Sequence, residues 1–201
     1  MDLVEEVVPL DDGELVLERP RDSEALLREE AFEHEELLPY WAELWPSGVA
    51  LARALSGRAL RGARTLELGC GLGVASIAAA LHGGRVVATD WSAGAIMLTE
   101  RNAARNGARL RTVRCAFADT PRLEGEHTWD LVLAADVLYE RRNIPLLLHV
   151  LPRLLAPRGE VLLADPGRPA APAFLERARA AWKVRTTGED GVAVHRLRPV
   201  A

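Results

Sequence analysis

The 201-residue sequence is poor in the residues that build disulfide frameworks and metal centres. Its two cysteines, Cys70 and Cys115, belong to no C-x-x-C pair and lie near no histidine cluster. Zinc sites use such spacings, and disulfide frameworks use several pairs of cysteines. We therefore expect neither a disulfide framework nor a bound metal.

Long apolar runs and an excess of positive charge are also missing. No apolar stretch reaches the roughly 18 residues typical of a membrane-spanning helix. Residues 1–9 carry Asp2, Glu5 and Glu6 where a signal peptide has its basic start. The formal net charge of −4 argues against a dedicated nucleic-acid binder, because such proteins need a basic face. We expect a cytoplasmic protein without a membrane segment.

The composition that is present fits one globular domain, with 49% hydrophobic and 27% charged residues. We divide residues 1–201 into an N-terminal extension, 1–38, and a core, 39–201. Within the extension, residues 3–19 predict a hairpin around the turn signal Asp11-Asp12-Gly13. Residues 22–38 predict an acidic helix whose charges face solvent.

The core alternates short apolar strands with helices. Expected strands cover 64–68, 85–89, 110–117, 129–134 and 160–164, and expected helices cover 49–55, 74–81, 93–106, 144–155 and 170–182. Near-continuous apolar strands joined by helices predict a parallel sheet covered on both faces. Right-handed crossovers then give a doubly wound, Rossmann-like α/β fold. A closing hairpin at 184–197 breaks this rhythm and predicts one antiparallel strand at a sheet edge.

A glycine-rich loop, Glu67-Leu68-Gly69-Cys70-Gly71-Leu72-Gly73, joins the first core strand to its helix. Glycines permit a sharp turn and close approach of a ligand, and the following helix directs free N–H groups at it. The G-x-G-x-x-G dinucleotide pattern fails from Gly69 and matches only partly from Gly71. A P-loop is absent. Glu67, Gly69, Gly71 and Gly73 are candidate cofactor residues, and a tight turn without ligand is the alternative.

Two aspartates follow the next two strands. Asp90 lies roughly 20 residues past the glycines, where a carboxylate accepts hydrogen bonds from ribose hydroxyls. Its alternative role is a helix N-cap, which Ser92 fills equally well. Asp119 is a candidate acceptor for the exocyclic amine of adenine, with an Asx-turn as the alternative. Their neighbours Trp91 and Ala118 join the candidate cofactor set.

The segment Ala134-Ala135-Asp136-Val137-Leu138-Tyr139 follows the strand at 129–134. Ligands of doubly wound sheets bind beyond the carboxyl ends of the strands. Asp136 and Tyr139 are therefore candidates for binding and orienting an amine, and Ala135 for contacting the cofactor. The alternative is a charged turn followed by a core tyrosine.

Taken in order, Glu67–Gly73, Asp90, Asp119 and Asp136 resemble the motif series of the class I, seven-β-strand methyltransferases. The resemblance spans about residues 40–168. It implies S-adenosylmethionine as the cofactor. It also implies a sheet ordered 3-2-1-4-5-7-6, with strand 7 antiparallel.

A narrower resemblance connects the chain to the protein-lysine methyltransferase branch. It rests on Pro39–Gly48 (PYWAELWPSG), Asp136–Tyr139 (DVLY) and Ala164–Pro169 (ADPGRP), which are most similar to the electron-transfer flavoprotein β-subunit lysine methyltransferases. The resemblance implies that Asp136 and Tyr139 mark the substrate site and that the segment around Trp45 lies over the cofactor. Helical packing of Trp41 and Trp45 in the core is the alternative. Many relatives have tryptophan where this chain has Thr120.

The expected activity is therefore S-adenosylmethionine-dependent N-methylation of a protein lysine, with the electron-transfer flavoprotein β subunit as a candidate partner. A lysine amine, with a pKa near 10.4, must lose a proton before it attacks. Asp136 would orient the amine, and Tyr139 would close the lysine channel or hydrogen-bond the nitrogen. A methyltransferase for a small molecule or RNA is one alternative, favoured by a closed apolar or arginine-lined crevice. A non-catalytic nucleoside- or partner-binding domain is another, and the intact glycine loop argues against it.

Overall fold

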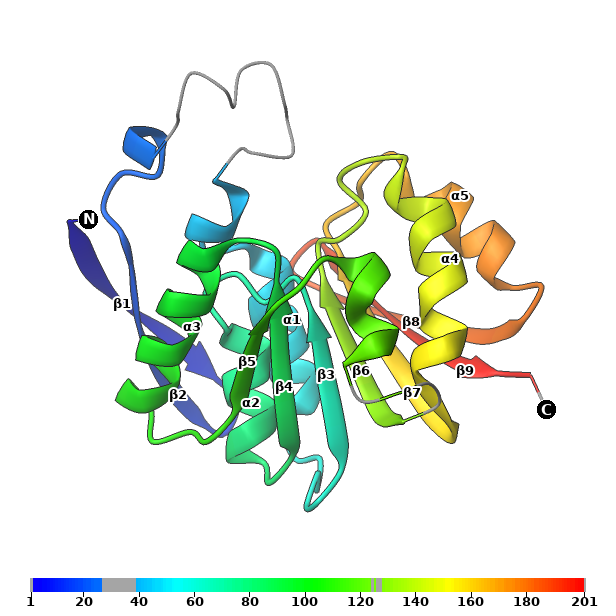
Figure 1. The fold of residues 1–201 in the computed structure, drawn as a ribbon, viewed down its shortest axis with the longest axis horizontal. Helices are drawn as coiled ribbons and strands as arrows, with labels where there is room; N and C mark the ends of the chain where they lie inside the picture. Colours follow the sequence, from blue (N-terminus) through cyan, green and yellow to red (C-terminus); the bar gives the residue numbers. More distant parts are fainter. Residues whose placement is uncertain (1, 27–38, 124, 126–127, 201) are drawn as a thin grey trace.

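A seven-stranded sheet forms the centre of the computed structural model, which describes residues 2–26, 39–123, 125 and 128–200 (Figure 1). In spatial order its strands are β5 (Arg111–Arg114), β4 (Arg85–Asp90), β3 (Arg64–Leu68), β6 (Trp129–Ala135), β7 (Leu155–Asp165), β9 (Val192–Pro199) and β8 (Trp182–Glu189). β9 runs antiparallel to both of its neighbours, β7 and β8, and the other neighbouring strands are parallel. Counted along the chain, this is the predicted order 3-2-1-4-5-7-6.

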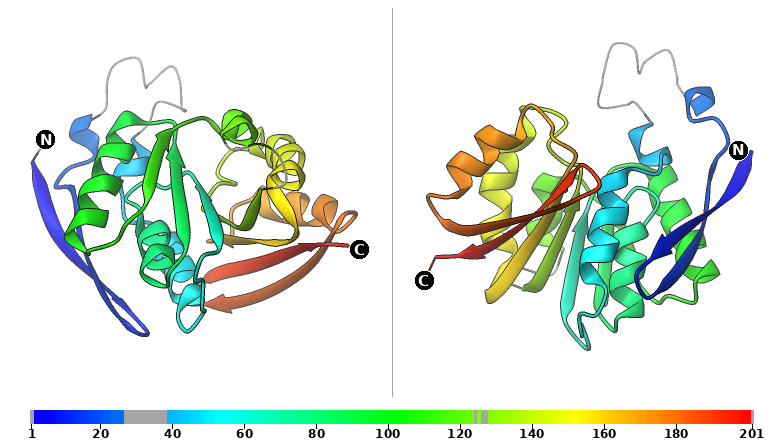
Figure 2. Two further views of the ribbon diagram at one scale, coloured as in Figure 1. Left: turned by 60° about the horizontal axis from the view of Figure 1, so that its bottom comes forward. Right: turned by 180° about the vertical axis from the view of Figure 1, so that it is seen from behind.

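Helices cover both faces of the sheet, as expected of a doubly wound fold (Figure 2). One face carries α1 (Pro46–Leu55), α2 (Val74–Leu81) and α3 (Ala93–Arg105), and the other carries α4 (Asn143–Leu154) and α5 (Ala171–Ala178). Side chains alternate along a strand. Val132 of β6 therefore packs in the α4 and α5 core, whereas its neighbours Leu131 and Leu133 pack beneath α1 and α2. Within the described residues, no helix combines the length and apolar character needed to cross a bilayer.

The predicted N-terminal hairpin is confirmed as β1 (Leu3–Leu10) and β2 (Gly13–Pro20). It lies against α3, where the side chains of Asn102 and Asn106 hydrogen-bond the backbone of β2. The Asn106 side-chain amide accepts the Val16 N–H at 2.9 Å and donates to the Val16 carbonyl at 2.8 Å. The acidic helix predicted over 22–38 shows one described 3-10 turn, η1 (Glu24–Leu26). Its remainder falls on 27–38, outside the described residues.

Three elements differ from the sequence-based prediction. β5 ends at Arg114, and residues 117–122 form a 3-10 helix, η5 (Phe117–Arg122), whose Pro121 cannot donate to a strand ladder. α5 stops at Ala178, and Trp182, predicted at its end, instead starts β8 with a buried side chain. The antiparallel strand was expected at the sheet edge, but β9 lies one place inside it, with β8 outermost.

The parallel strands bring several loops to one edge of the sheet. The carboxyl ends of β3, β4, β6 and β7 meet there because these four strands run in the same direction. The short 3-10 helix η4 (Tyr40–Ala42) and the start of α1 come to the same edge. A pocket opens at this edge.

Candidate active site

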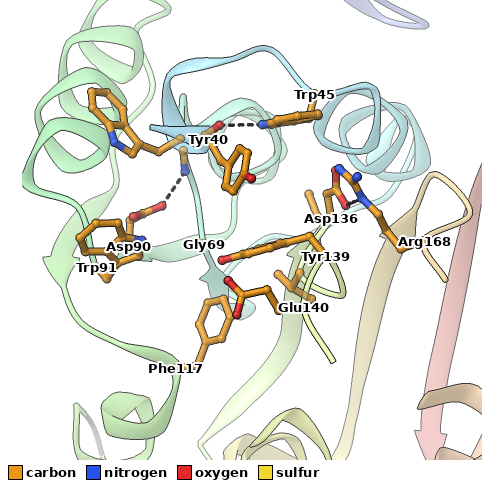
Figure 3. A pocket seen from close by; sticks show the side chains of 14 residues that line it. Tyr40, Trp45, Gly69, Asp90, Trp91, Phe117, Asp136, Tyr139, Glu140 and Arg168 are labelled. Atoms are coloured by element: carbon orange, nitrogen blue, oxygen red, sulfur yellow. Dashed lines mark hydrogen bonds and ion pairs between the residues drawn. The ribbon is translucent and has the colours of Figure 1, made fainter. Parts of the chain in front are cut away.

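A pocket of about 220 Å³ opens at the carboxyl ends of these strands (Figure 3). Its walls come from η4 and the start of α1, the glycine loop, and the ends of β4, β6 and β7. The lining residues are Tyr40, Trp41, Trp45, Gly69, Gly71, Asp90, Trp91, Phe117, Ala135, Asp136, Val137, Tyr139, Glu140 and Arg168. Asp90 and Trp91 lie at one end, Asp136 and Arg168 at the other, and Tyr139 lies between them (Figure 3).

The glycine loop supplies bare backbone to the first end of the pocket. Gly71 has a left-handed φ of 53°, and its N–H donates to the Asp90 carboxylate at 3.1 Å. A Cβ at Gly71 would lie 3.3 Å from the Trp41 carbonyl oxygen, so a side chain there would have to push the Trp41 backbone away by a few tenths of an ångström. Gly69 faces the Phe117 ring, 3.5 Å from where a Cβ would sit. This loop is a cradle in which backbone can approach a ligand closely.

Glu67 and Gly73, also predicted as cofactor residues, shape the loop and do not line the pocket. Glu67 is 1% exposed and accepts hydrogen bonds from the Ser76 backbone N–H, at 2.9 Å, and from the Ser76 hydroxyl. Burial raises the pKa of Glu67 to about 8. At Gly73 a Cβ would lie 2.9 Å from Thr99, so this glycine lets α2 pack closely against α3.

Asp90 lies on the pocket wall with its side chain almost fully buried. One carboxylate oxygen accepts the Gly71 N–H and the other accepts the Ser92 N–H at 2.9 Å. Burial raises the pKa of Asp90 above its usual range, while these backbone donors oppose the rise. Ser92, whose hydroxyl accepts the Gly94 N–H at 3.2 Å, is the N-cap of α3. Each Asp90 oxygen therefore retains acceptor capacity for a ribose hydroxyl.

The residues that follow β4 and β5 divide into two groups. Trp91 and Phe117 line the pocket and offer aromatic surface. Ala118 and Asp119 lie in η5 but do not line it, and both are exposed. The Asp119 side chain pairs with Arg122 at 3.3 Å. The adenine role of Asp119 stays a prediction, and the structure brings Phe117 to the pocket instead.

Asp136 begins the loop after β6 and reaches the opposite end of the pocket. Its φ of 53° is left-handed, a conformation that aspartate tolerates better than most residues. The Asp136 N–H donates to the Ala164 carbonyl at 2.8 Å, which holds the end of β6 against β7. Ala135 precedes it on the pocket wall. Both carboxylate oxygens of Asp136 accept hydrogen bonds from Arg168, at 2.8 and 2.7 Å.

Aromatic rings surround this carboxylate. The Tyr40 ring lies 5.7 Å from that of Tyr139 and 6.3 Å from that of Trp45 between centroids. The Trp45 indole N–H donates to the Tyr40 carbonyl at 2.6 Å. Burial, then the charges of Glu140 and Asp90, raise the pKa of Tyr139, so its phenol stays neutral near pH 7.

Trp41 and Trp45 do not share a helix, although their spacing allows it. Trp41 lies in η4, and Trp45 is the N-cap of α1. A Cβ at Gly94 would lie 2.4 Å from the Trp41 ring, so Trp41 packs against the first turn of α3. Trp41 thus packs partly in the core, although it does not share a helix with Trp45. Both tryptophans also line the pocket.

Arg168 is the main site residue that sequence reasoning missed. The turn Asp165-Pro166-Gly167 places it, because the Asp165 carboxylate accepts the N–H groups of Gly167 and Arg168 at 2.8 and 2.7 Å. The available signal was an arginine directly after a D-P-G turn, at the end of a strand next to β6. Tyr40, Phe117 and Glu140 were also not predicted as site residues.

The sheet order and the site at its carboxyl edge define a class I methyltransferase. Solved structures support this fold. A ribosomal protein L11 methylase from Lactobacillus delbrueckii aligns with a TM-score of 0.63 at 19% identity, covering 77% of this chain and 79% of that one. A SAM-dependent methyltransferase from Aquifex aeolicus aligns with a TM-score of 0.62 at 18% identity, covering 78% and 94%.

The chain belongs to the lysine methyltransferase family, whose model matches residues 33–179. The Xenopus laevis electron transfer flavoprotein beta subunit lysine methyltransferase is 37% identical over 136 residues, covering 65% of this chain and 53% of that protein. The mouse EEF1A lysine methyltransferase 3 is 34% identical over 130 residues, covering 62% and 55%. The chain spans about half the length of these relatives. The predicted family, that of S-adenosylmethionine-dependent lysine methyltransferases, is confirmed.

Proposed function

We propose that this chain is an S-adenosylmethionine-dependent N-methyltransferase that methylates a lysine side chain of a protein. The observation that carries the proposal is that one pocket joins two kinds of binding surface. A glycine cradle with a buried carboxylate, Asp90, lies at one end, and a carboxylate among aromatic rings, Asp136, lies at the other. A methyl donor and an amine acceptor need such adjacent surfaces, because the reacting atoms must be held close together and in line.

The residues at the first end fit an adenosyl group. Asp90 would accept hydrogen bonds from the ribose hydroxyls, and Gly69 and Gly71 would let the ligand lie against the backbone. Trp91 and Phe117 would pack against its apolar surface. The bound cofactor would supply a methyl group on a positively charged sulfur. The rim of aromatic side chains would exclude water from that methyl group.

The second end fits the side chain of a lysine. Tyr40, Trp45 and Tyr139 would form the walls along its methylenes and remove water from the amine, which favours the neutral form that attacks. The Tyr139 hydroxyl would hydrogen-bond the nitrogen. Asp136 was expected to orient the amine, and its oxygens already accept hydrogen bonds from Arg168. An arriving lysine would therefore meet a paired carboxylate.

The proposed partner is a protein that presents a lysine at this opening. The electron-transfer flavoprotein β subunit is the first candidate, because several relatives of 33–38% identity are named for it. It can be tested directly as a purified acceptor. Label transferred to other proteins only would overturn this partner and leave the lysine reaction standing.

The experiment is to incubate cell lysate with methyl-labelled S-adenosylmethionine and the purified enzyme. We expect a labelled protein band that protease removes and ribonuclease does not. Asp136→Asn should abolish the band. Asp190→Asn is the matched control, because Asp190 also has a left-handed φ, 51°, but lies on an exposed turn between β8 and β9. Label only in RNA or small molecules would contradict the proposal.

Self-methylation can be separated from transfer to a partner. Lys183 is the only lysine of the chain. Label in the enzyme's own band should therefore vanish in Lys183→Arg if it sits on a lysine side chain. Label in the acceptor band should be the same for Lys183→Arg and the wild type.

A further inference from the structure

The ion pair between Arg168 and Asp136 is the most constrained charged contact of the pocket. Nε and a terminal nitrogen of Arg168 each bond a different carboxylate oxygen, at 2.8 and 2.7 Å. This two-point geometry is specific to arginine. The Arg168 guanidinium also lies 5.5 Å from the centre of the Trp45 ring, a cation–π distance. Asp136 is 7% exposed, so removal of the arginine would leave a buried, uncompensated charge.

The charges that face the acceptor end come from three segments. Asp136 and Glu140 follow β6, Asp90 ends β4, and Arg168 follows β7. Glu140 is paired with Arg142, and Asp90 lies at the cofactor end with two backbone donors. Tyr40 and Tyr139 add phenol groups, and Asp165 lies buried behind the Arg168 turn. Arg168 is therefore the group that sets the net charge felt beside Asp136.

We infer that Arg168 is a positioning residue that neutralises Asp136, so that the acceptor lysine is held as the free amine and not as the ammonium ion. The inference rests on the proposed function. A bare carboxylate within about 4–6 Å of an amine stabilises the ammonium form and raises the pKa of the amine. A carboxylate already paired with a guanidinium exerts little net field while it still offers lone pairs to an N–H donor.

This arrangement agrees with the balance of the reaction. The lysine ammonium first releases one proton to solvent. The nitrogen lone pair then forms the bond to the methyl carbon, and the electron pair of the breaking carbon–sulfur bond remains on sulfur. The positive charge passes from sulfur to the methylated nitrogen. A site that favoured the ammonium beforehand would oppose the first of these steps.

The test is the pH dependence of kcat, measured with the acceptor protein purified from the labelled band and supplied at a saturating concentration. In Arg168→Gln we expect the alkaline rise of kcat to move up by about one pH unit, with about a tenfold loss at neutral pH that disappears at high pH. Arg168→Lys keeps the positive charge and should keep the wild-type profile at a lower kcat. The matched control is Arg53→Gln, because Arg53 pairs with Asp190 at 3.1 Å and neither residue lines this pocket; it should keep the wild-type profile.

Two other outcomes would overturn the inference. A loss of kcat in Arg168→Gln that is equal at every pH would assign Arg168 a purely structural role. A gain in kcat would show that the ion pair only blocks the acceptor end. Calorimetric binding of S-adenosylhomocysteine by each variant shows whether the cofactor end is intact. If the wild type binds this compound but labels no protein, the proposed function fails, and the inference fails with it.

Discussion

The two ends of the pocket are built in different ways. At the cofactor end, carboxylates bond to backbone: Asp90 accepts the N–H groups of Gly71 and Ser92, and Glu67 accepts that of Ser76. At the acceptor end, side chains contact side chains: Asp136 pairs with Arg168, and Tyr40 lies beside Tyr139.

This difference teaches which part of the site is fixed by local sequence. The cofactor-end contacts join the loops after β3 and β4, which are neighbours in the sequence and in the sheet. The acceptor end needs contacts between η4, β6 and β7, which lie far apart in the sequence. Substitutions at the two ends should therefore have separable effects on cofactor binding, methyl transfer and stability.

The largest expected effect is on the rate of methyl transfer to the acceptor. Asp136→Asn should lower kcat/KM by about 100-fold or more, because an acceptor held slightly out of line loses most of its reactivity. Asparagine tolerates the left-handed φ at this position, so the loop should keep its shape. Rates from labelled-methyl transfer check this, with Asp190→Asn as the control. Weaker binding of S-adenosylhomocysteine by Asp136→Asn would contradict the assignment of Asp136 to the acceptor end alone.

The second effect is on the pH dependence of stability. The folded-state pKa of Glu67, about 8, exceeds its unfolded value, so the native state retains a proton that the unfolded state loses as the pH rises. Wild-type stability should fall between about pH 4.5 and pH 8, by about 4 kcal/mol from this group. Glu67→Gln should lack that part of the fall. Urea unfolding at several pH values measures it, and a constant difference between the two proteins would contradict it.

A smaller effect concerns cofactor affinity. Asp90→Ala should weaken binding of S-adenosylhomocysteine by about 10- to 100-fold, the range expected when hydrogen bonds to a charged acceptor are lost. Calorimetry measures the Kd. Unchanged affinity would show that ribose hydroxyls do not bind there.

The smallest expected effect sharpens the same comparison within one loop. Ser92→Ala removes the N-cap of α3 and should cost about 1 kcal/mol of stability. It should leave the Kd for S-adenosylhomocysteine close to that of the wild type, because Ser92 does not line the pocket. Thermal unfolding and calorimetry on the same samples separate the two quantities. A large loss of affinity would mean that Ser92 positions Asp90.

The sequence was sufficient for the sheet, the glycine loop and Asp90, because each is encoded by a short pattern. Apolar periodicity located the strands, and the motif resemblance implied their order, including the antiparallel β9. The boundary of β5 was not predictable from periodicity, since Phe117 continues the apolar pattern into η5. The edge position of the antiparallel strand was wrong because periodicity does not say which strand of the last hairpin pairs with β7.

The acceptor end was predicted only in part for the same physical reason. Asp136 and Tyr139 follow a strand and were found by position. Their partner Arg168 is 32 residues away along the chain, and only the adjacency of β6 and β7 brings the two side chains together. Glu67 and Gly73 match the glycine-loop motif, but burial and packing against Thr99, which a motif does not encode, keep them off the pocket wall.

The most direct test of the account is to identify the amino acid that receives the methyl group. Acceptor protein labelled from S-adenosylmethionine by the wild-type enzyme would be hydrolysed and its amino acids separated. We predict radioactivity in methylated lysine, and none when Asp136→Asn replaces the wild type. Radioactivity in another methylated residue, or equal labelling by the variant, would contradict the assignment of this pocket to lysine.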